Sequence, residues 1–398
     1  MIELLLGLTV LPVILPAFSL LVLTVAALGA GYPQARIPAR APAAGVERPR
    51  VAVLVPAHDE SVHVLPTIAC LQAQLGPRDR LVVIADNCSD DTAARARAVG
   101  ADAIERCDPQ RRGKGYALAF GVDRLRLDPP EVVLVVDADC ILSADAVTVI
   151  ARECLRSARP VQMLDLMSAG AGAGLKLRVL EFAMLMKNLV RPLGSFRLGQ
   201  ACHLMGTGMA FPWPLIAGAE LATGHVAEDM KLGVELTKAG HAPRFLVDAQ
   251  VSSAFVRDTG VAKVQKSRWE HGHLATLAEE LPGLLRAALL ARDPALMVLA
   301  MDLMIPPVAF YFLLLGALLA ATVLAAWIWP VFGAMAVLMA LGTACFALGI
   351  GLAWFFFGRH LLSARELLST PLYALWKLPV YVAFFLKKRS SWVRTRRD

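Results

Sequence analysis

The sequence predicts an α/β domain with a mostly parallel sheet, flanked on both sides by helices that span a membrane. Hydrophobic residues make up 57% of the 398 residues and charged residues only 18%, whereas soluble domains have about 45–50% apolar and about 25% charged residues. The apolar excess lies in two blocks near the ends of the chain. Between them, short apolar runs alternate with stretches of helical length. This composition excludes an intrinsically disordered chain, because disorder requires low hydrophobicity.

The chain is basic, with a formal net charge of +7 at pH 7. Such a balance suits nucleic acid or the anionic surface of a membrane. The apolar excess favours membrane lipids, so we expect no nucleic-acid partner. The seven cysteines are scattered and form no CxxC pair. They therefore indicate neither a disulfide framework nor a zinc site, but reduced thiols facing the cytosol.

The first predicted element is a membrane span at residues 4–30, which carry no charge. About 20 apolar residues are enough to cross a bilayer. No basic segment precedes this stretch, which favours an uncleaved anchor over a signal peptide. Residues 32–50 are rich in Pro, Ala and Arg and are typical of a juxtamembrane linker.

Three apolar runs at 51–55, 81–85 and 132–136 are the next elements. Runs that are apolar throughout and separated by helix-length segments are typical of buried parallel strands. Each run is followed by acidic or amide side chains, at 58–60, 86–87 and 137–139. Because ligands of open α/β sheets bind beyond the carboxyl ends of the strands, these side chains indicate one binding crevice.

Two groups of charged residues near these strands suit a diphosphate. Asp137 and Asp139 stand at i and i+2 after the third run, and paired carboxylates can hold Mg²⁺ together with substrate phosphates. The alternative is that Asp caps a turn there. Lys114 lies in the segment RRGKGY at 111–116, where a helix is predicted to begin. A basic helix start favours a diphosphate, although a solvated basic loop is the simpler interpretation.

Two further groups lie on predicted helices. Glu228 and Asp229 precede a helix at 230–239, so that either could act as a general base or cap the helix. Gln265, Arg268 and Trp269 are spaced i, i+3 and i+4, which places them on one helical face. An amide, a guanidinium and an indole can together bind a sugar and a phosphate. The alternative is a membrane-surface helix with interfacial Trp and Arg.

The C-terminal block predicts two spans, at 305–328 and 331–357, joined by a tight turn at Trp329-Pro330. Basic residues follow the first and last spans, whereas the turn has none. The positive-inside rule therefore places the central domain and the C-terminus in the cytoplasm. The apolar segment 367–386 contains Lys377 and two prolines. We expect it to lie in the membrane interface, with the basic tail against anionic headgroups.

Seven motifs follow one another along the middle of the chain. They are PAHDE at 56–60, ADNCSDDT at 85–92, RGKGYAL at 112–118, DAD at 137–139, GTGMAF at 206–211, ED at 228–229 and QKSRW at 265–269. With them, the chain resembles the membrane-bound family 2 glycosyltransferases, which include cellulose-synthase-like and poly-N-acetylglucosamine-synthase-like enzymes. The resemblance implies a cytoplasmic GT-A (Rossmann-like) catalytic domain flanked by transmembrane helices. The implied boundaries are an N-terminal transmembrane helix at 1–31, a linker at 32–50, the catalytic domain at 51–280, an interfacial segment with two transmembrane helices at 281–358, and an interfacial helix with a basic cytoplasmic tail at 359–398.

The resemblance also implies roles for individual residues. Asp229 matches the catalytic general base of inverting enzymes, and Glu228 stands beside it as a second catalytic candidate. The implied donor-binding residues are Ala57, Glu60, Asp86, Lys114, Asp137, Asp139 and Arg268, of which Asp86 matches the residue that contacts the nucleotide base. The implied acceptor-binding residues are Gly206, Thr207, Gln265 and Trp269. Asp137 and Asp139 match the DxD motif, which binds Mg²⁺ or Mn²⁺. Two positions depart from the family pattern: Ala227 and Ala85 replace the usual Thr and Asp.

The implied reaction moves a sugar from a nucleotide-sugar donor, with a UDP-sugar expected, to a saccharide or lipid-linked acceptor, and inverts the anomeric configuration. It would serve exopolysaccharide or cell-surface glycan synthesis as a multi-pass protein of the bacterial inner membrane, with synthase or export subunits as further partners. Two alternatives remain: a single-addition transferase acting on a lipid or polyprenyl acceptor, and a non-catalytic subunit of a synthase or export complex. A transporter would require ionisable residues within the spans, but Asp302 at an edge is the only charge in 295–357.

Overall fold

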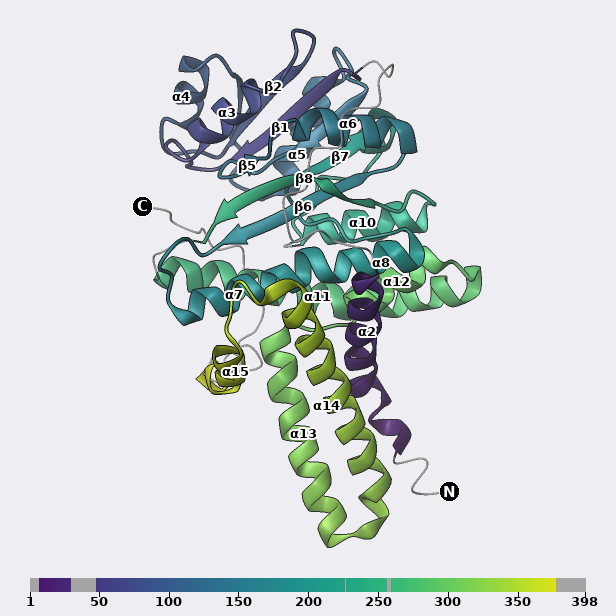
Figure 1. Ribbon diagram of the computed structural model, residues 1–398. Helices are drawn as coiled ribbons and strands as arrows, with labels where there is room; N and C mark the ends of the chain where they lie inside the picture. The colour runs from purple at the N-terminus through teal and green to yellow at the C-terminus, as the bar shows by residue number, and fades with distance from the viewer. Residues whose placement is uncertain (1–6, 30–47, 226, 256–258, 377–398) are drawn as a thin grey trace. The chain divides into compact units, whose positions relative to one another are not determined.

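The computed structural model describes residues 7–29, 48–225, 227–255 and 259–376, without the side chains of 259–267 and 372–376. The described chain forms two compact units. An α/β unit comprises residues 48–168 and 200–272, and a helical unit comprises residues 7–29, 169–199 and 273–376. Figure 1 shows the elements of both.

The α/β unit is built on one eight-stranded sheet in the order β3-β2-β1-β4-β7-β6-β8-β5. The strands are β1 (Val51–Ala57), β2 (Arg80–Asp86), β3 (Asp102–Arg106), β4 (Val132–Val135), β5 (Ile141–Leu142), β6 (Val161–Ser168), β7 (Met209–Pro212) and β8 (Arg244–Ala254). The neighbours β3, β2, β1 and β4 are all parallel, while β7 runs antiparallel to both β4 and β6. The three strands expected from the apolar runs are therefore confirmed as β1, β2 and β4, side by side.

Helices cover both faces of this sheet, which explains why the central parallel strands β1, β2 and β4 are mainly apolar. Alternate residues of β1 enter two different cores. Val53 and its neighbours pack with α3 (Val64–Gln72), α4 (Thr92–Ala98) and α6 (Ala146–Ser157). Leu54 packs on the other face with α5 (Lys114–Leu125), α9 (Trp213–Ala217) and α10 (Glu228–Lys238). The sheet is thereby a rigid layer whose strand ends are fixed in space.

The helical unit contains most of the apolar sequence. Its helices are α2 (Leu11–Leu28), α7 (Leu175–Leu185), η1 (Met186–Val190), α8 (Arg191–Gly199), α12 (Pro294–Leu303), α13 (Val308–Ile328), η2 (Pro330–Phe332), α14 (Gly333–Ala353), η3 (Trp354–Gly358) and α15 (Ala364–Trp376). The long helix α11 (Thr259–Ala291) belongs to the α/β unit up to residue 272 and to the helical unit beyond it.

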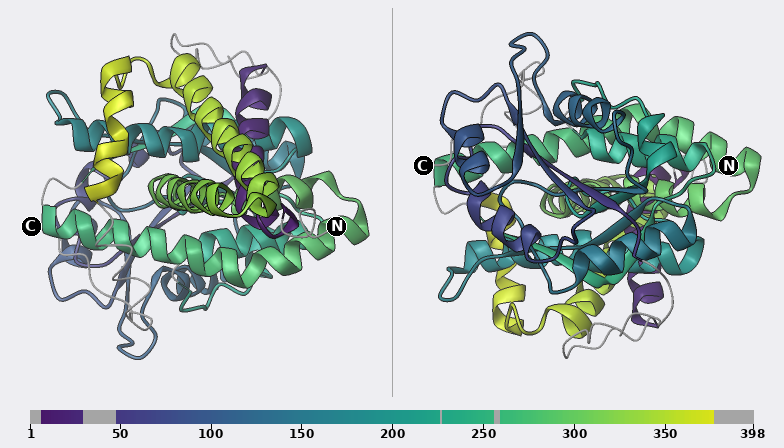
Figure 2. Two further views of the ribbon diagram at one scale, coloured as in Figure 1. Left: turned by 90° about the horizontal axis from the view of Figure 1, so that it is seen from below. Right: turned by 90° about the horizontal axis from the view of Figure 1, so that it is seen from above.

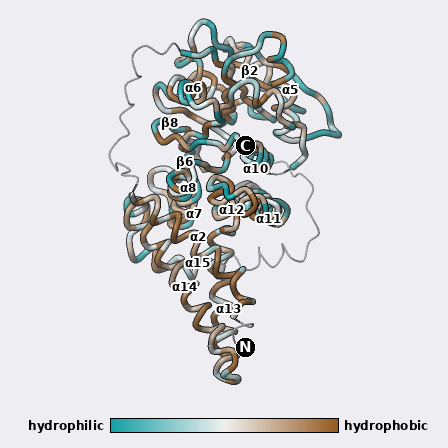
Figure 3. The backbone as a smooth tube through the Cα atoms, turned by 90° about the vertical axis from the view of Figure 1, so that its right-hand side faces the viewer, coloured by the Kyte–Doolittle hydropathy of each residue, from teal (hydrophilic) through white to brown (hydrophobic). Residues whose placement is uncertain are grey.

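Three helical segments among the described residues are long and apolar enough to cross a membrane: Leu11–Leu28, Val308–Ile328 and Pro330–Gly358. They coincide with the three expected spans, and the expected turn at Trp329-Pro330 joins the last two. Figure 3 shows α13 and α14 as hydrophobic along their lengths, and Figures 1 and 2 show α2 beside α14. The contact is close, since a Cβ added at Gly342 would lie 2.6 Å from Ile14 Cγ2.

Two segments expected from the sequence need comment in the helical unit. Residues 169–199, inside the range expected for the catalytic domain, belong to the helical unit with the three long apolar helices. They form α7, η1 and α8, and α8 contacts α2 and α12. Of the expected interfacial segment 367–386, residues up to 376 form part of α15, and the rest lies outside the described residues.

A buried ion pair joins α8 to α12. Arg191 Nε lies 2.5 Å from Asp302 Oδ1, and Arg191 Nη2 donates to the Asp302 carbonyl oxygen at 2.6 Å. Each residue is only 5% exposed. Asp302, which the sequence suggested as an isolated charge near a span, is therefore paired across the unit.

We expect Arg191→Met to destabilise the protein by about 3–5 kcal/mol, because removing one partner leaves a buried charge uncompensated. The thermal unfolding temperature of detergent-purified protein measures the effect. Arg197→Met, on the exposed side of the same helix, is the matched control and should change little. The double variant Arg191→Met/Asp302→Leu should recover most of the loss. Equal shifts for Arg191→Met and Arg197→Met would contradict the role of the pair.

Candidate active site

The carboxyl ends of β1, β2 and β4 meet at one edge of the sheet, because these strands are parallel neighbours. The polar segments that follow them carry the predicted donor-binding residues. Ala57 ends β1 and is paired in register with Ala85 of β2. Glu60 follows three residues later and donates its backbone N–H to Thr92 Oγ1 at 2.9 Å. Ala57 and Asp86 therefore lie at the ends of neighbouring strands, and Glu60 lies beside the start of α4.

Asp86, the last residue of β2, is buried and held by an arginine. Arg106 Nη1 at the end of β3 donates to Asp86 Oδ1 at 2.6 Å, and Asn87 Nδ2 donates to the same oxygen at 3.1 Å. The Arg106 guanidinium also lies over the ring of Tyr116, 5.6 Å from its centroid. Arg106 and Asn87 thus both orient the Asp86 carboxylate through its Oδ1 atom.

Lys114 connects the basic segment to the DxD turn. Its Nζ donates to Asp137 Oδ1 and, at 2.8 Å, to the carbonyl oxygen of Gly206. Burial opposes its charge, but the carboxylates of Asp137 and Glu228 outweigh burial and raise the pKa of Lys114 above its usual value. The ammonium is therefore charged and partly neutralises the acidic side chains around it.

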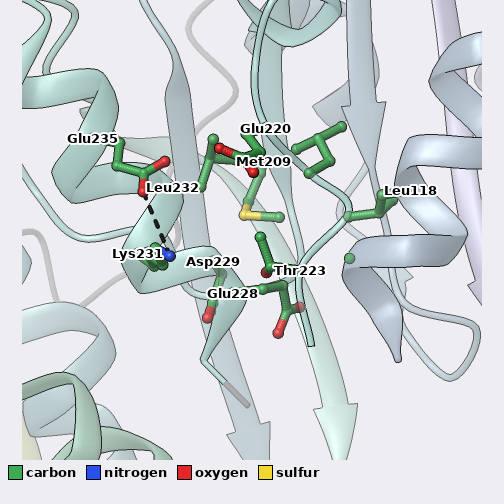
Figure 4. A pocket seen from close by; sticks show the side chains of 11 residues that line it. Leu118, Met209, Glu220, Thr223, Glu228, Asp229, Lys231, Leu232 and Glu235 are labelled. Carbon is green, nitrogen blue, oxygen red and sulfur yellow. Dashed lines mark ion pairs between the residues drawn. The ribbon is translucent and has the colours of Figure 1, made fainter. Parts of the chain in front are cut away.

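Glu228 and Asp229 form the first turn of α10, two residues earlier than the expected helix start. A Cβ added at Gly206 would lie 3.3 Å from Asp229 Oδ2 and 3.6 Å from Lys114 Nζ. Figure 4 shows the Glu228 and Asp229 carboxylates beside Thr223, in a pocket also lined by Glu220 and Leu221. The structure thus brings Lys114, Asp137, Gly206 and Asp229 together.

The comparisons with known proteins agree with this geometry. Residues 49–272, more than half of the chain, match the profile described as "Glycosyltransferase like family 2". The chain belongs to this family. No curated protein matches the sequence significantly.

Solved structures of other glycosyltransferases are similar to this chain, and the first of them supports its fold. The mannosyltransferase PcManGT from Pyrobaculum calidifontis, in complex with GDP-Man and Mn²⁺, is similar with a TM-score of 0.50 and 18% identity, over 84% of this chain and 99% of that chain. The glucosyl-3-phosphoglycerate synthase from Mycobacterium tuberculosis is similar with a TM-score of 0.32 and 19% identity, over 52% of this chain and 69% of that chain. The α/β unit has the GT-A fold expected from the sequence.

The QKSRW motif of the glycosyltransferase lies in α11. Arg268 and Trp269 are half-buried there, in the part that belongs to the α/β unit. Gln265 is part of the helix, but its side chain lies outside the described residues. The helical spacing expected from the sequence is present.

A second acidic group at the strand ends stabilises a loop. Ligand atoms of Asp59, Cys88 and Asp90 lie within 4.8 Å of one another. However, Asp59 accepts bonds from the backbone N–H groups of Ser89 and Asp90, and Asp90 accepts from Thr92. Burial raises the pKa of the Cys88 thiol to about 11. These contacts fix the loop after β2.

Several residues that shape the site had no signal in the sequence. Arg106 donates to Asp86, Thr67 to the carbonyl oxygen of Ala138, and Gln162 to the carbonyl oxygen of Thr207. Each partner is far away in the sequence, so the type and position of these three residues alone did not indicate a role in the site. Thr207, expected at the acceptor, is buried, and its hydroxyl is bonded within the domain. Gly206, also expected there, lies between Lys114 and Asp229.

The protonation of Glu228 gives a prediction for stability. Burial and the neighbouring Asp229 carboxylate raise the pKa of Glu228 from 4.5 to about 8. The folded protein therefore keeps this proton up to about pH 8, whereas the unfolded chain loses it near pH 4.5. Stability should fall as the pH rises between these values and stay low above them.

We therefore expect Glu228→Gln, which cannot ionise, to raise the thermal unfolding temperature clearly at pH 9 and much less at pH 5. Tryptophan fluorescence of the detergent-purified protein during heating measures both. Glu235→Gln, in the same pocket, is the control. A gain of equal size at the two pH values would show that the proton on Glu228 is not the cause.

Proposed function

We propose that this glycosyltransferase moves a sugar from a UDP-sugar to a saccharide or lipid-linked acceptor at the membrane, with inversion at the anomeric carbon. The observation that carries the proposal is the convergence of Asp137, Lys114 and Asp229 around Gly206. A diphosphate-binding turn and a carboxylate base are thereby close enough to act on one small substrate. Family membership supports the transfer reaction itself.

The contacts of Asp86 support uridine as the base of the donor. Among the described residues, Arg106 and Asn87 both donate to Oδ1, which leaves Oδ2 to accept from a ligand. Uracil presents one imide N–H, which a single carboxylate oxygen can accept. Guanine presents N1–H and the N2 amino group side by side, and these are best matched by both oxygens of a carboxylate.

The DxD turn fits a divalent ion. Asp137 and Asp139 offer oxygen ligands two residues apart on one turn, which is the ligand type that Mg²⁺ and Mn²⁺ prefer. The turn already holds a cationic group, because Lys114 donates to Asp137. When bound, such an ion supplies positive charge to the departing diphosphate. We propose that Asp139 is the main ligand, with Asp137 beside it.

In the proposed reaction, Asp229 accepts the proton of the acceptor hydroxyl while that oxygen attacks the anomeric carbon. The bond from this carbon to the diphosphate oxygen breaks, and the nucleoside diphosphate leaves on the opposite face. Lys114 and Arg268 stabilise the negative charge that develops on the leaving group. Trp269 and Gln265 hold the acceptor sugar. Retention of Asp139 and Asp229 favours an active enzyme over a non-catalytic subunit.

We propose that the three apolar helices span the inner membrane and keep the catalytic domain and the C-terminus in the cytoplasm. The basic residues that flank the spans support this orientation. In a cysteine-free background, an impermeant thiol reagent added to intact cells should label Trp327→Cys, which precedes the turn between α13 and α14. Leu127→Cys, on the α/β unit, should stay unlabelled. The reverse pattern would overturn the orientation.

The transfer reaction is tested with purified protein and a panel of nucleotide sugars. We expect UDP and one UDP-sugar to bind with Mn²⁺, and GDP to bind much more weakly. Linkage and length analysis of the product then identifies the acceptor and separates polymer synthesis from single addition to a lipid. Tighter binding of GDP than of UDP would contradict the assignment of the base. Retention of the anomeric configuration would contradict the mechanism.

A further inference from the structure

A short loop before β7 is fixed to the sheet by a buried glutamine. The Met205 N–H donates to Gln162 Oε1 at 2.8 Å, and Gln162 Nε2 donates to the carbonyl oxygen of Thr207 at 2.9 Å. The Met163 N–H donates to the carbonyl oxygen of Gly208 at 2.9 Å. The Gln162 side chain is fully buried. Because buried amides are costly to leave unpaired, these bonds hold the loop in one conformation.

Thr207 in this loop is bonded to both ends of the DxD turn. Its Oγ1 accepts the Asp137 N–H at 3.1 Å and donates to Cys140 Sγ at 3.5 Å. The turn itself is closed by a bond from the Cys140 N–H to the Asp137 carbonyl oxygen at 3.2 Å. A hydroxyl is needed to accept from one group and donate to the other. At 5% exposure, Thr207 has little surface left for a substrate.

A second buried threonine, on α3, contacts the same turn. Thr67 Oγ1 on α3 donates to the Ala138 carbonyl oxygen at 2.8 Å, and Thr67 is fully buried. The turn between β4 and β5 is therefore bonded from α3 and from the loop before β7. The two hydroxyls bond backbone groups of Asp137 and Ala138 and the Cys140 thiol, and neither bonds a carboxylate of the turn.

We propose that Thr67 and Thr207 are positioning residues, which hold the Asp137–Asp139 turn in the conformation that binds the metal and the donor diphosphate. Thr207 then serves the donor site and makes no contact with the acceptor. The inference rests on the proposed function, because it assumes that this turn binds the donor. It assigns a role to two hydroxyls that never touch a substrate.

The test compares Thr207→Val, which keeps the shape of the side chain, with Thr207→Ser, which keeps the hydroxyl. Thr237→Val is the matched control, since this buried hydroxyl bonds only within α10. Titration of purified protein with Mn²⁺ and UDP, followed by electron paramagnetic resonance, measures affinity. Loss of a buried hydrogen bond should weaken binding about tenfold in Thr207→Val and Thr67→Val. Thr207→Ser and Thr237→Val should stay near the wild-type value.

Steady-state kinetics and hydrogen exchange complete the test. The KM for the donor should rise in Thr207→Val, while the KM for the acceptor stays unchanged. Amide exchange of the 137–140 segment should become faster in Thr207→Val and Thr67→Val only. Unchanged Mn²⁺–UDP affinity, or a higher acceptor KM alone, would overturn the inference. If wild-type protein fails to bind Mn²⁺ and UDP, the proposed function fails, and the exchange rates alone decide whether the threonines fix the turn.

Discussion

Replacing Asp229 with asparagine should lower the rate of sugar transfer by about 10²–10⁴-fold, the usual contribution of a positioned general base. Asparagine keeps the size of the side chain and suits a helix N-terminus as well as aspartate does. Donor binding and thermal stability should therefore stay close to the wild-type values. The measurement pairs single-turnover transfer rates with UDP affinity on the same preparation.

Glu235→Gln is the matched control for Asp229→Asn. Glu235 lines the same pocket on the same helix, but it pairs with Lys231 at 3.8 Å. Its replacement should alter the transfer rate little. Near-normal transfer by Asp229→Asn would show that the carboxylate only stabilises the start of α10, and the base would have to be sought elsewhere.

Replacing Asp139 with alanine should abolish metal-dependent transfer. A metal ion that stabilises transition-state charge is worth several kcal/mol, which corresponds to a rate loss of about 10³-fold. EDTA should stop transfer by the wild-type protein, and Mn²⁺ or Mg²⁺ should restore it. Asp139→Ala should respond to neither, and its affinity for Mn²⁺ should fall in parallel.

Asp90→Ala separates loss of the metal from general loss of acidic charge. Asp90 lies in the acidic loop after β2, where it accepts bonds from Thr92 and Ser61. The variant should still respond to Mn²⁺ with unchanged affinity. Full activity of Asp139→Ala in excess chelator would show that the reaction needs no ion at the DxD turn.

The strands β1, β2 and β4 could be predicted from the sequence because they are buried on both faces, whereas their parallel neighbour β3 is partly exposed and mostly charged and gave no such signal. Strands buried on both faces are apolar throughout, and the polar residues after them mark one edge. The strands β5 to β8, which pair in both directions, had no such signal either. β8 is half-buried along much of its length, β6 is buried only over its first five residues, and β5 has only two residues. Their pairing depends on long-range contacts that no local pattern records.

The site was predictable where a residue type suits a known chemistry. Asp137, Asp139 and Asp229 carry charges that a diphosphate or a proton transfer requires. By contrast, the ion pair of Asp86 with Arg106 joins two strands, and the bonds of Thr207 join loops 70 residues apart. Residues 169–199 are less apolar than the three long apolar helices, so their packing in the same unit was not predictable either.

Because Lys114 donates to Asp137, the lysine ammonium and a divalent ion compete for the same carboxylate of the DxD turn. Its resting partner is the ammonium of Lys114, the first residue of α5, so a divalent ion that took the same Asp137 oxygen would have to displace this group. A diphosphate that arrives with the ion gives the ammonium a new anionic partner. Metal and nucleotide should therefore load together, because each removes the cost that the other would face alone. A metal ion that binds without a nucleotide has to compete with the Lys114 ammonium, which is part of the chain and stays beside Asp137.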